Sequence, residues 1–181
     1  TPATGLKSGA SAGEALIKLL PKSTMGVMAV DVTRAMGTDM AMKALQDPKS
    51  REKYDEFVEM TGIDPMKDIS YFGFGIISTS SGPATQNDGG FIVNLKYDKA
   101  KLLGLLKEKA PSFEEETYNG VAIYSNLDGG EAKQTTQAAF LDASHIVVGS
   151  AGGVRGIIDV HQKKAESLAK NAGMAAVLAK V

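Results

Sequence analysis

The sequence predicts an α+β fold in which helices pack on one face of a mainly antiparallel sheet of about six strands. Three features of the chain support this fold class. The dipeptide Asn119-Gly120 separates two strand-like runs, which is a strong signal for a two-residue hairpin. Two further apolar runs flank Asp142-Ala143-Ser144 and predict a second hairpin. Helical patterns follow the first, third and last predicted strands, so helices interrupt a series of strands that hairpins join.

The composition is that of an ordinary globular protein, with 43% hydrophobic and 23% charged residues in a chain of 181. A chain of this length can bury one sizeable core, so we expect a single domain over residues 13–181. The small, polar and glycine-bearing residues 1–12 are expected to form a flexible N-terminal tether. The sequence leaves open whether this domain belongs to a longer, tandem-domain protein with a second half after Val181.

The charge balance and the missing residue types exclude several functions. A formal net charge of −1, with only three arginines among 20 basic residues, argues against nucleic-acid binding. The absence of cysteine excludes thiol catalysis, disulfides, iron–sulfur clusters and cysteine-ligated zinc. No apolar run is long enough to span a bilayer. We therefore expect no cofactor, no nucleic-acid partner and no transmembrane segment in this chain.

Start and stop residues mark the predicted helices. Side chains that accept backbone N–H groups stand at most of the starts, and proline or glycine stands at several ends. The helices are predicted from a capping box at Ser11 and Glu14 to Pro21, over 33–45 with Gly37 as a weak point, from Asp47-Pro48 to Gly62, from Asp98 to Pro111, from Ser150 to His161, and weakly over 165–170 and 172–181.

Apolar runs of strand length mark the predicted strands. They cover 25–32, 70–79, 91–97, 113–118, 121–126 and the two runs within 137–149, with polar connections over 80–90 and 127–136. The dense apolar run over 25–32 is expected to be a buried strand. Within 70–79, Gly73 and Gly75 fall on the same face, which predicts close approach by another backbone, a helix or a ligand.

Five stretches of the chain, in order, resemble uncharacterised bacterial proteins that are secreted or lipid-anchored domains of unknown function. The stretches are LIKLLPKSTMGVMAVDV, GIDPMKDISYFGFGI, GGFIVNLKYDKAKLLGLLKEKAP, EEETYNGVAIYSN and AAFLDASHIVVGSAGGVRGIIDV. The resemblance covers most of the chain from Leu16 onward. It implies a tandem α+β architecture and an extracytoplasmic address, in the periplasm or at the cell surface, and it leaves a lipid anchor upstream open. It brings no catalytic residue.

A glycine-rich turn over Gly149–Gly156 carries the candidate binding site, because free N–H groups at a helix start can hold an anion. The candidate ligand-binding residues are Ser150, Gly152, Gly153 and Arg155. Their spacing matches neither common phosphate-binding motif, so the favoured interpretation is that Ser150 caps the helix and the glycines let it pack closely on the sheet. An open cleft with Arg155 and a histidine would support ligand binding, whereas a covered helix start would support packing.

A methionine group and an acidic run each have a functional and a structural interpretation. Methionine thioethers can bind Cu(I), but methionines also fill cores or form adaptable binding surfaces, and we favour these two structural interpretations. The five methionines concerned are Met25, Met28, Met36, Met40 and Met42. The run Glu114–Glu116 is expected on a solvated sheet edge, where like charges discourage edge-to-edge pairing. No metal site is predicted.

The two histidines, His145 and His161, show no metal-binding or catalytic spacing and are expected at a strand start and a helix end. A serine hydrolase site would need Ser150 to meet one of them after folding. The predicted function is a non-enzymatic binding or structural module of the cell envelope, with an envelope protein or a small ligand as its partner. The alternative is a small-ligand or anion-binding protein, or a hydrolase, that uses the Gly149–Gly156 turn.

Overall fold

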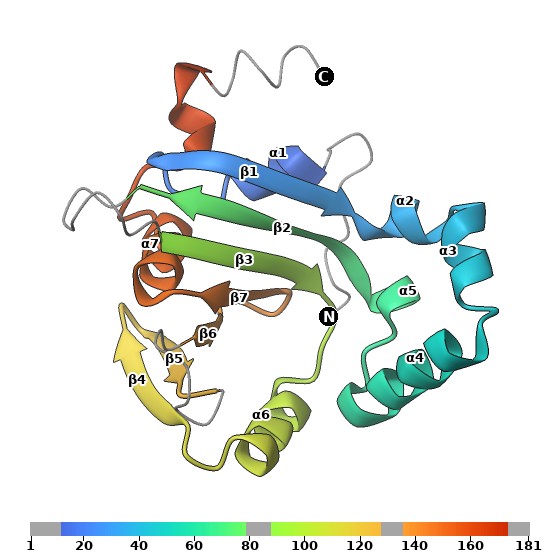
Figure 1. Cartoon of the computed structure of the whole chain (residues 1–181). Coiled ribbons are helices and arrows are strands. Elements are labelled where there is room, and N and C mark those ends of the chain that lie inside the picture. Colours follow the sequence, from blue (N-terminus) through green and yellow to red (C-terminus); the bar gives the residue numbers. More distant parts are fainter. Residues whose placement is uncertain (1–11, 79–87, 128–135, 174–181) are drawn as a thin grey trace.

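The computed structural model describes residues 12–78, 88–127 and 136–173, which form one sheet with helices around it (Figure 1). Seven strands pair in the order β1-β2-β3-β7-β6-β5-β4, and every pairing is antiparallel. The strands are β1 (Thr24–Asp31), β2 (Ile69–Ile77), β3 (Asp88–Leu95), β4 (Glu114–Tyr118), β5 (Val121–Ser125), β6 (Gln137–Phe140) and β7 (His145–Gly149). This is the predicted α+β fold, with seven strands where about six were expected.

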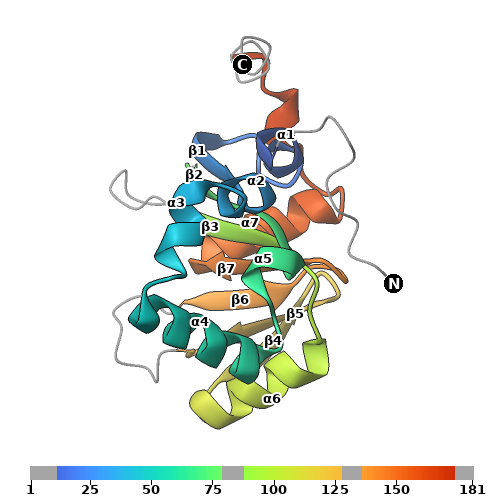
Figure 2. The same ribbon diagram turned by 90° about the vertical axis from the view of Figure 1, so that its right-hand side faces the viewer.

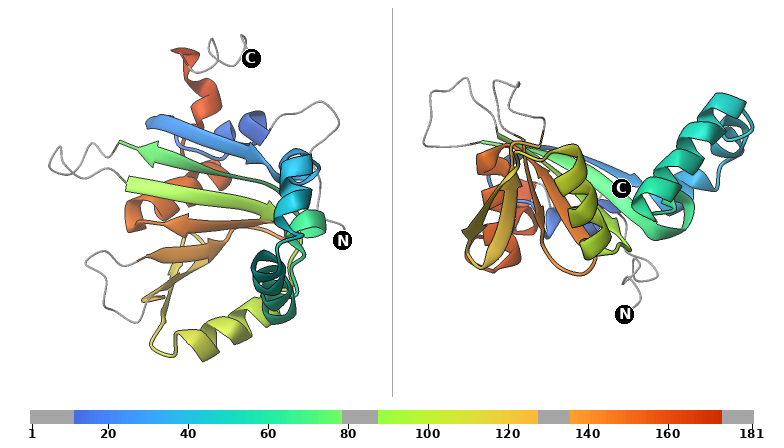
Figure 3. Two further views of the ribbon diagram at one scale, coloured as in Figure 1. Left: turned by 45° about the vertical axis from the view of Figure 1, so that its right-hand side comes forward. Right: turned by 90° about the horizontal axis from the view of Figure 1, so that it is seen from below.

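Two helices cover one face of this sheet. Helix α1 (Ala12–Ile17) packs against β1 and β2, and α7 (Ala151–His161) packs against β3, β7 and β6. Figure 3 shows both helices on the same side of the sheet. The other helices lie at its ends, and Figure 2 shows α4 and α6 at the opposite end of the molecule from α1. They are α2 (Val32–Met36), α3 (Asp39–Ala44), α4 (Pro48–Thr61), α5 (Pro65–Asp68) and α6 (Lys99–Lys109). The 3-10 helix η1 (Leu168–Lys170) instead packs beside α1.

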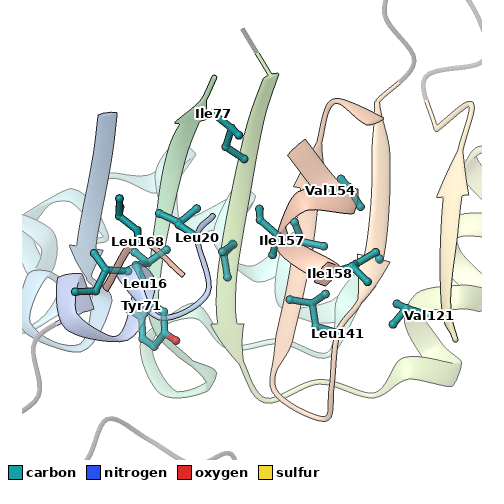
Figure 4. Close-up of a cluster of buried hydrophobic side chains, with 14 of the residues drawn as sticks. Leu16, Leu20, Tyr71, Ile77, Val121, Leu141, Val154, Ile157, Ile158 and Leu168 are labelled. Carbon is teal, nitrogen blue, oxygen red and sulfur yellow. The ribbon is translucent and has the colours of Figure 1, made fainter. Parts of the chain in front are cut away.

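The hydrophobic core lies between the sheet and these two helices (Figure 4). Leu16 and Leu20 enter it from α1 and the turn that follows, and Ile157 and Ile158 enter it from α7, all fully buried. Leu168 of η1 closes the core beside α1. Burial of each such aliphatic side chain stabilises the fold by about 1.5–3 kcal/mol, so this one-sided core holds α1, α7 and η1 on the same face.

The two glycines of β2 explain how α1 comes so close to the sheet. A β-carbon at Gly73 would lie 2.1 Å from Leu16 Cδ1, and one at Gly75 would lie 2.6 Å from Leu20 Cδ2. Only hydrogen atoms at these two positions leave room for the leucine side chains. The predicted close approach is therefore confirmed, and the approaching element is the α1 segment.

The turn and capping residues place the element boundaries where the sequence predicted them. Asp47 accepts the backbone N–H of Ser50 at the start of α4, and Gly62 ends that helix with a left-handed φ of 74°. Asp98 caps α6 in the same way. Asn119 and Gly120 take φ angles of 51° and 81°, which matches the type I′ turn that joins β4 and β5.

Four local predictions were wrong. The helix expected over 33–45 is split, because α2 ends at Gly37 and α3 begins at Asp39. The strand expected to be buried is β1, which lies at the edge of the sheet and whose Met28 is 56% exposed on the face that α1 and α7 leave uncovered. Ala12, assigned to the tether, is buried and starts α1. The weak helix over 165–170 is a single 3-10 turn.

Several other predictions fall on residues outside the described part of the chain. These are the tether up to residue 11 with the cap at Ser11, most of the connections over 80–90 and 127–136, and the last weak helix beyond residue 173. None of the described helices is long and apolar enough to cross a membrane.

Candidate functional site

The predicted binding residue Ser150 lies at the start of α7, against the first residues of β3. Its hydroxyl accepts the N–H of Gly153 at 3.2 Å and the N–H of Gly89 at 3.1 Å. The same hydroxyl donates to Asp88 Oδ1 at 2.6 Å. Ser150 therefore caps the helix and ties it to β3. The anionic group at this helix start is the chain's own Asp88 carboxylate, which complements the partial positive charge there.

The glycines of the turn bring α7 and β3 into backbone contact. A β-carbon at Gly153 would lie 2.2 Å from the carbonyl oxygen of Gly89, and one at Gly149 would lie 2.2 Å from the same oxygen. A β-carbon at Gly152 would lie 2.1 Å from Asp88 Oδ2. The helix start is therefore covered by β3. This is the arrangement expected if the glycines serve close packing.

The fourth candidate residue, Arg155, bonds to β4 and not to the helix start. Its Nη2 donates to Glu116 Oε1 at 2.7 Å, and its guanidinium carbon lies 5.3 Å from the ring centroid of Tyr118. Tyr118 in turn donates to Asp159 Oδ2 at 3.0 Å, on the same helix. Arg155 thus joins α7 to the β4–β5 hairpin, and the four candidate residues do not converge on one open site.

Both histidines of the chain bond to a single carboxylate. Asp142 Oδ2 lies 2.9 Å from His145 Nδ1 and 3.1 Å from His161 Nε2. Asp142 stands in the turn between β6 and β7, His145 starts β7, and His161 ends α7. The sequence placed each histidine at the end of its element, as the structure does. Nothing in their spacing indicated a shared partner, because His161 comes 19 residues after Asp142.

The second ring nitrogen of His145 also has hydrogen-bond partners. His145 Nε2 lies 2.9 Å from both Tyr71 Oη and Asn94 Nδ2. Tyr71, Asn94 and His145 occupy neighbouring positions on β2, β3 and β7, on the face that carries the core. The backbone N–H of Ser144 adds a 2.8 Å bond to Asp142 Oδ1. The cluster is thus a polar plug at one end of the core, in which side chains bond to one another, although Asn94 Oδ1 and His161 Nδ1 are buried without a hydrogen-bond partner in the described part of the chain.

The electrostatics of this plug favour an ionised carboxylate. Burial by itself raises the pKa of Asp142, but hydrogen bonds from His145, from the backbone of Ser144 and from His161 outweigh it. They hold the pKa of Asp142 well below its usual range. Burial, assisted by the charge of Asp142, raises the pKa of Tyr71 to about 12. Around neutral pH the plug therefore contains a carboxylate beside a neutral phenol.

The plug lacks the geometry of a serine hydrolase. In a Ser-His-Asp triad the serine and the carboxylate bond to opposite ring nitrogens. Ser144 Oγ instead lies 3.2 Å from His145 Nδ1, the nitrogen that Asp142 also contacts. Ser150 stands at the opposite end of β7 from His145, about 17 Å along the strand, and at the opposite end of α7 from His161. The structure therefore keeps Ser150 apart from both histidines.

The usual metal ligands form no metal centre in the described part of the chain. Among residues 12–78, 88–127 and 136–173, no group of three or more histidine, cysteine, aspartate or glutamate side chains is placed to hold a metal ion. Met25 and Met28 are both more than half exposed on β1, and Met36 is half-buried on α2. The two strand methionines are therefore surface residues, so core packing is wrong for them, and the adaptable binding surface stays a prediction.

The sheet face opposite α1 and α7 is apolar, and we call it the open face. Figure 1 looks onto it, and no described helix crosses in front of β1, β2 or β3. Side chains alternate along each strand, so the residues on this face are those between the core positions. The open face consists of Met28, Val30, Phe72, Phe74, Ile76, Phe91, Val93, Ile146 and Val148.

The open-face residues pack against one another and leave their outer surfaces exposed. The rings of Phe72 and Phe91 lie 5.3 Å apart between centroids, and the ring of Phe74 lies over Gly89, where a β-carbon would be only 2.7 Å away. Met28 is 56% exposed and Ile76 is 38% exposed. No charged residue occupies a strand position on this face within residues 26–30, 72–76, 89–93 and 146–148.

Sequence reasoning did not single out this face, although β2 carried a signal for it. A sheet with helices on one side usually alternates apolar residues inside with polar residues outside. In β2 both faces are apolar, with Phe72, Phe74 and Ile76 on the side away from the core and Tyr71 and Ile77 on the core side. A strand of this kind predicts that both sides of the sheet are covered.

The chain gives no significant match to a protein-family model, a curated protein or a solved structure. Its class is therefore defined by the fold and the surface described above. It is an α+β protein with one seven-stranded antiparallel sheet, covered by α1 and α7 on one face and apolar on the other.

Proposed function

We propose that this chain is a non-enzymatic binding module of a bacterial cell envelope, and that its partner docks on the open face. The observation that carries the proposal is the continuous, uncharged apolar surface over β1, β2, β3 and β7. A catalytic role finds no support in the polar plug, because both nitrogens of His145 are used within the protein. Binding is therefore the activity that the geometry favours.

The size of the open face supports this proposal. Three strands of eight or nine residues and one of five, about 4.8 Å apart and at about 3.4 Å per residue, present roughly 500 Å². The largest apolar patch on a typical monomer is about 300–600 Å² and is often functional. At about 25 cal/mol per Å², full coverage of such a face would contribute on the order of 12 kcal/mol before the costs of association. That is enough to hold a partner.

The proposed location in the cell envelope rests on the resemblance to secreted and lipid-anchored bacterial domains. We propose a location in the periplasm or at the cell surface, with an envelope protein as partner. A lipid anchor upstream of Thr1 would be consistent with this location. Expression of the natural gene with a C-terminal epitope, followed by cell fractionation and surface protease treatment, tests the address. Recovery of the tagged protein in the cytoplasmic fraction would overturn it.

The binding role is tested by placing a charge on the open face. Met28→Lys should abolish retention of envelope proteins by the immobilised chain, because burying a lysine ammonium against an apolar partner is costly. Its free energy of unfolding should stay within about 0.5 kcal/mol of the wild type, since Met28 is 56% exposed. Retention is measured by pull-down and mass spectrometry, and stability by urea unfolding.

Met60→Lys is the matched control, because Met60 is 45% exposed but lies on α4, outside the open face. It should retain the same proteins as the wild type. Equal retention by all three chains would show that the open face is not the binding surface. A large loss of stability in Met28→Lys alone would show that this residue belongs to a covered core, and that outcome would also overturn the proposal.

A further inference from the structure

We infer that the partner on the open face is a second copy of this chain, so that two sheets pack face to face as a twofold-symmetric dimer. This inference rests on the proposed function and names its partner, so the envelope protein that the immobilised chain retains would be another copy of this chain. The pair would form four layers, with α1 and α7 of each copy outside and the two sheets inside. Each sheet would then be covered on both faces, as the apolar residues on both sides of β2 require.

The distribution of side-chain size over the open face is complementary to itself. Along the strands, Met28 on β1 is level with Val148 on β7, and Phe72 on β2 is level with Val93 on β3, whereas Phe74 on β2 is level with Phe91 on β3. A twofold axis that runs parallel to the strands, between the sheets and near the line between β2 and β3, places β1 and β2 over β7 and β3 of the other copy. Met28 and Phe72 then meet the smaller Val148 and Val93 of the other copy, and Phe74 meets Phe91, between sheets stacked about 10 Å apart.

The area of the open face meets what a specific dimer needs. Each copy presents roughly 500 Å² of face, so a pair buries roughly 1,000 Å², which is the lower limit for a specific interface. We therefore expect a dissociation constant on the order of micromolar. With a net charge of −1 on each chain and no charge on the face, two copies meet almost no electrostatic repulsion.

The two edges of the sheet differ in a way that favours face-to-face packing over edge-to-edge growth. The β4 edge carries Glu114, Glu115 and Glu116, all exposed, and like charges there oppose strand addition. The β1 edge begins next to Pro21, which forms an antiparallel bridge with Ser167, so the C-terminal segment flanks its first residues. An association through the open face needs neither edge.

Sedimentation equilibrium of the wild-type chain, from below about 1 μM to about 100 μM, tests the inference. The wild type should pass from monomer to dimer over this range. Met28→Lys and Ile76→Lys should each raise the dissociation constant at least about tenfold, because each places a lysine in the interface. Met60→Lys should leave it unchanged. The inference would be overturned if the wild type stayed monomeric. It would also be overturned if Met60→Lys raised the dissociation constant as much as Met28→Lys and Ile76→Lys do.

Cysteine-directed crosslinking tests the position of the axis, because the chain has no cysteine of its own. In the inferred dimer the two copies of Val93 are offset laterally by about 5 Å, whereas the two copies of Met28 are offset by about 14 Å. A short bismaleimide should therefore link Val93→Cys into a covalent dimer and leave Met28→Cys unlinked. Preferential linkage of Met28→Cys would overturn the arrangement.

The experiments can refute the dimer without refuting the proposed binding role. A monomeric wild type that still retains envelope proteins through the open face refutes the second copy and leaves the binding module standing. A monomeric wild type whose retention is insensitive to Met28→Lys refutes both.

Discussion

Replacing Gly153 by alanine is the sharpest test of the packing interpretation of the glycine-rich turn. The added β-carbon would lie 2.2 Å from the carbonyl oxygen and 2.6 Å from the carbonyl carbon of Gly89, whereas ordinary contacts lie at 3.4–4 Å. Both atoms belong to the backbone of β3, so no side chain can turn aside. Helix α7 and strand β3 would have to separate by about 1 Å, across the buried contacts of Ile157.

The magnitude follows from two opposing effects. Forced repacking of a tight core contact costs about 1–3 kcal/mol, and a clash with backbone belongs at the upper end. Alanine is favoured over glycine in a helix by up to about 1 kcal/mol. Gly153→Ala should therefore lower the free energy of unfolding by about 2 kcal/mol. For a chain of this size, that corresponds to a fall in Tm of about 4–8 °C.

Gly104→Ala is the control, because Gly104 lies within α6 and a β-carbon there meets nothing within 4 Å. Helix propensity acts alone at this position, so the variant should gain up to about 1 kcal/mol. Urea unfolding followed by circular dichroism measures both variants. If Gly153→Ala were as stable as the wild type, or gained as much as Gly104→Ala, the inference that this glycine is needed for close packing would be refuted.

Two further predictions concern the polar plug. The lowered pKa of Asp142 means that its ionised form stabilises the fold above about pH 4, and that this contribution is lost as the pH falls further. Asp142→Asn should therefore weaken the loss of stability in acid, measured by urea unfolding at stepped pH with the exposed Glu56→Gln as control; an unchanged acid dependence would contradict this. Tyr71, with its pKa raised to about 12, contributes stability that is present below about pH 10 and lost as the pH rises towards 12. Tyr71→Phe should reduce the alkaline loss of stability, and a wild-type alkaline profile in this variant would show that the phenol is not held neutral by the fold.

The local structure of the chain was largely predictable because it depends on residues close in sequence. Asp47 caps α4 through the N–H of Ser50, three residues away, and Gly62 supplies the left-handed conformation that ends the same helix. Asn119 and Gly120 form their turn from their own backbone preferences. These short-range effects act before any tertiary contact forms. They define where most elements begin and end.

The candidate sites were much less predictable, because their partners are distant in the chain. Ser150 was expected to cap α7, and it does, but its bond to Asp88 spans 62 positions. Asp142 was predicted only as part of a hairpin turn, yet it bonds to both histidines once β7 and α7 have packed. The open face became visible only when the register of β1, β2, β3 and β7 placed nine apolar residues together.

The sequence by itself determined the fold class, the hairpins and the caps of this protein, since hydrophobic periodicity and turn chemistry act over a few residues. Tertiary structure decided the strand order, in which β7 inserts between β3 and β6. It also decided which side of the sheet the helices cover. Met28 illustrates the difference, because an apolar run predicts a strand equally well at the centre or at the edge of a sheet. Its place on the edge strand β1, on the face that no described helix covers, makes it a surface residue.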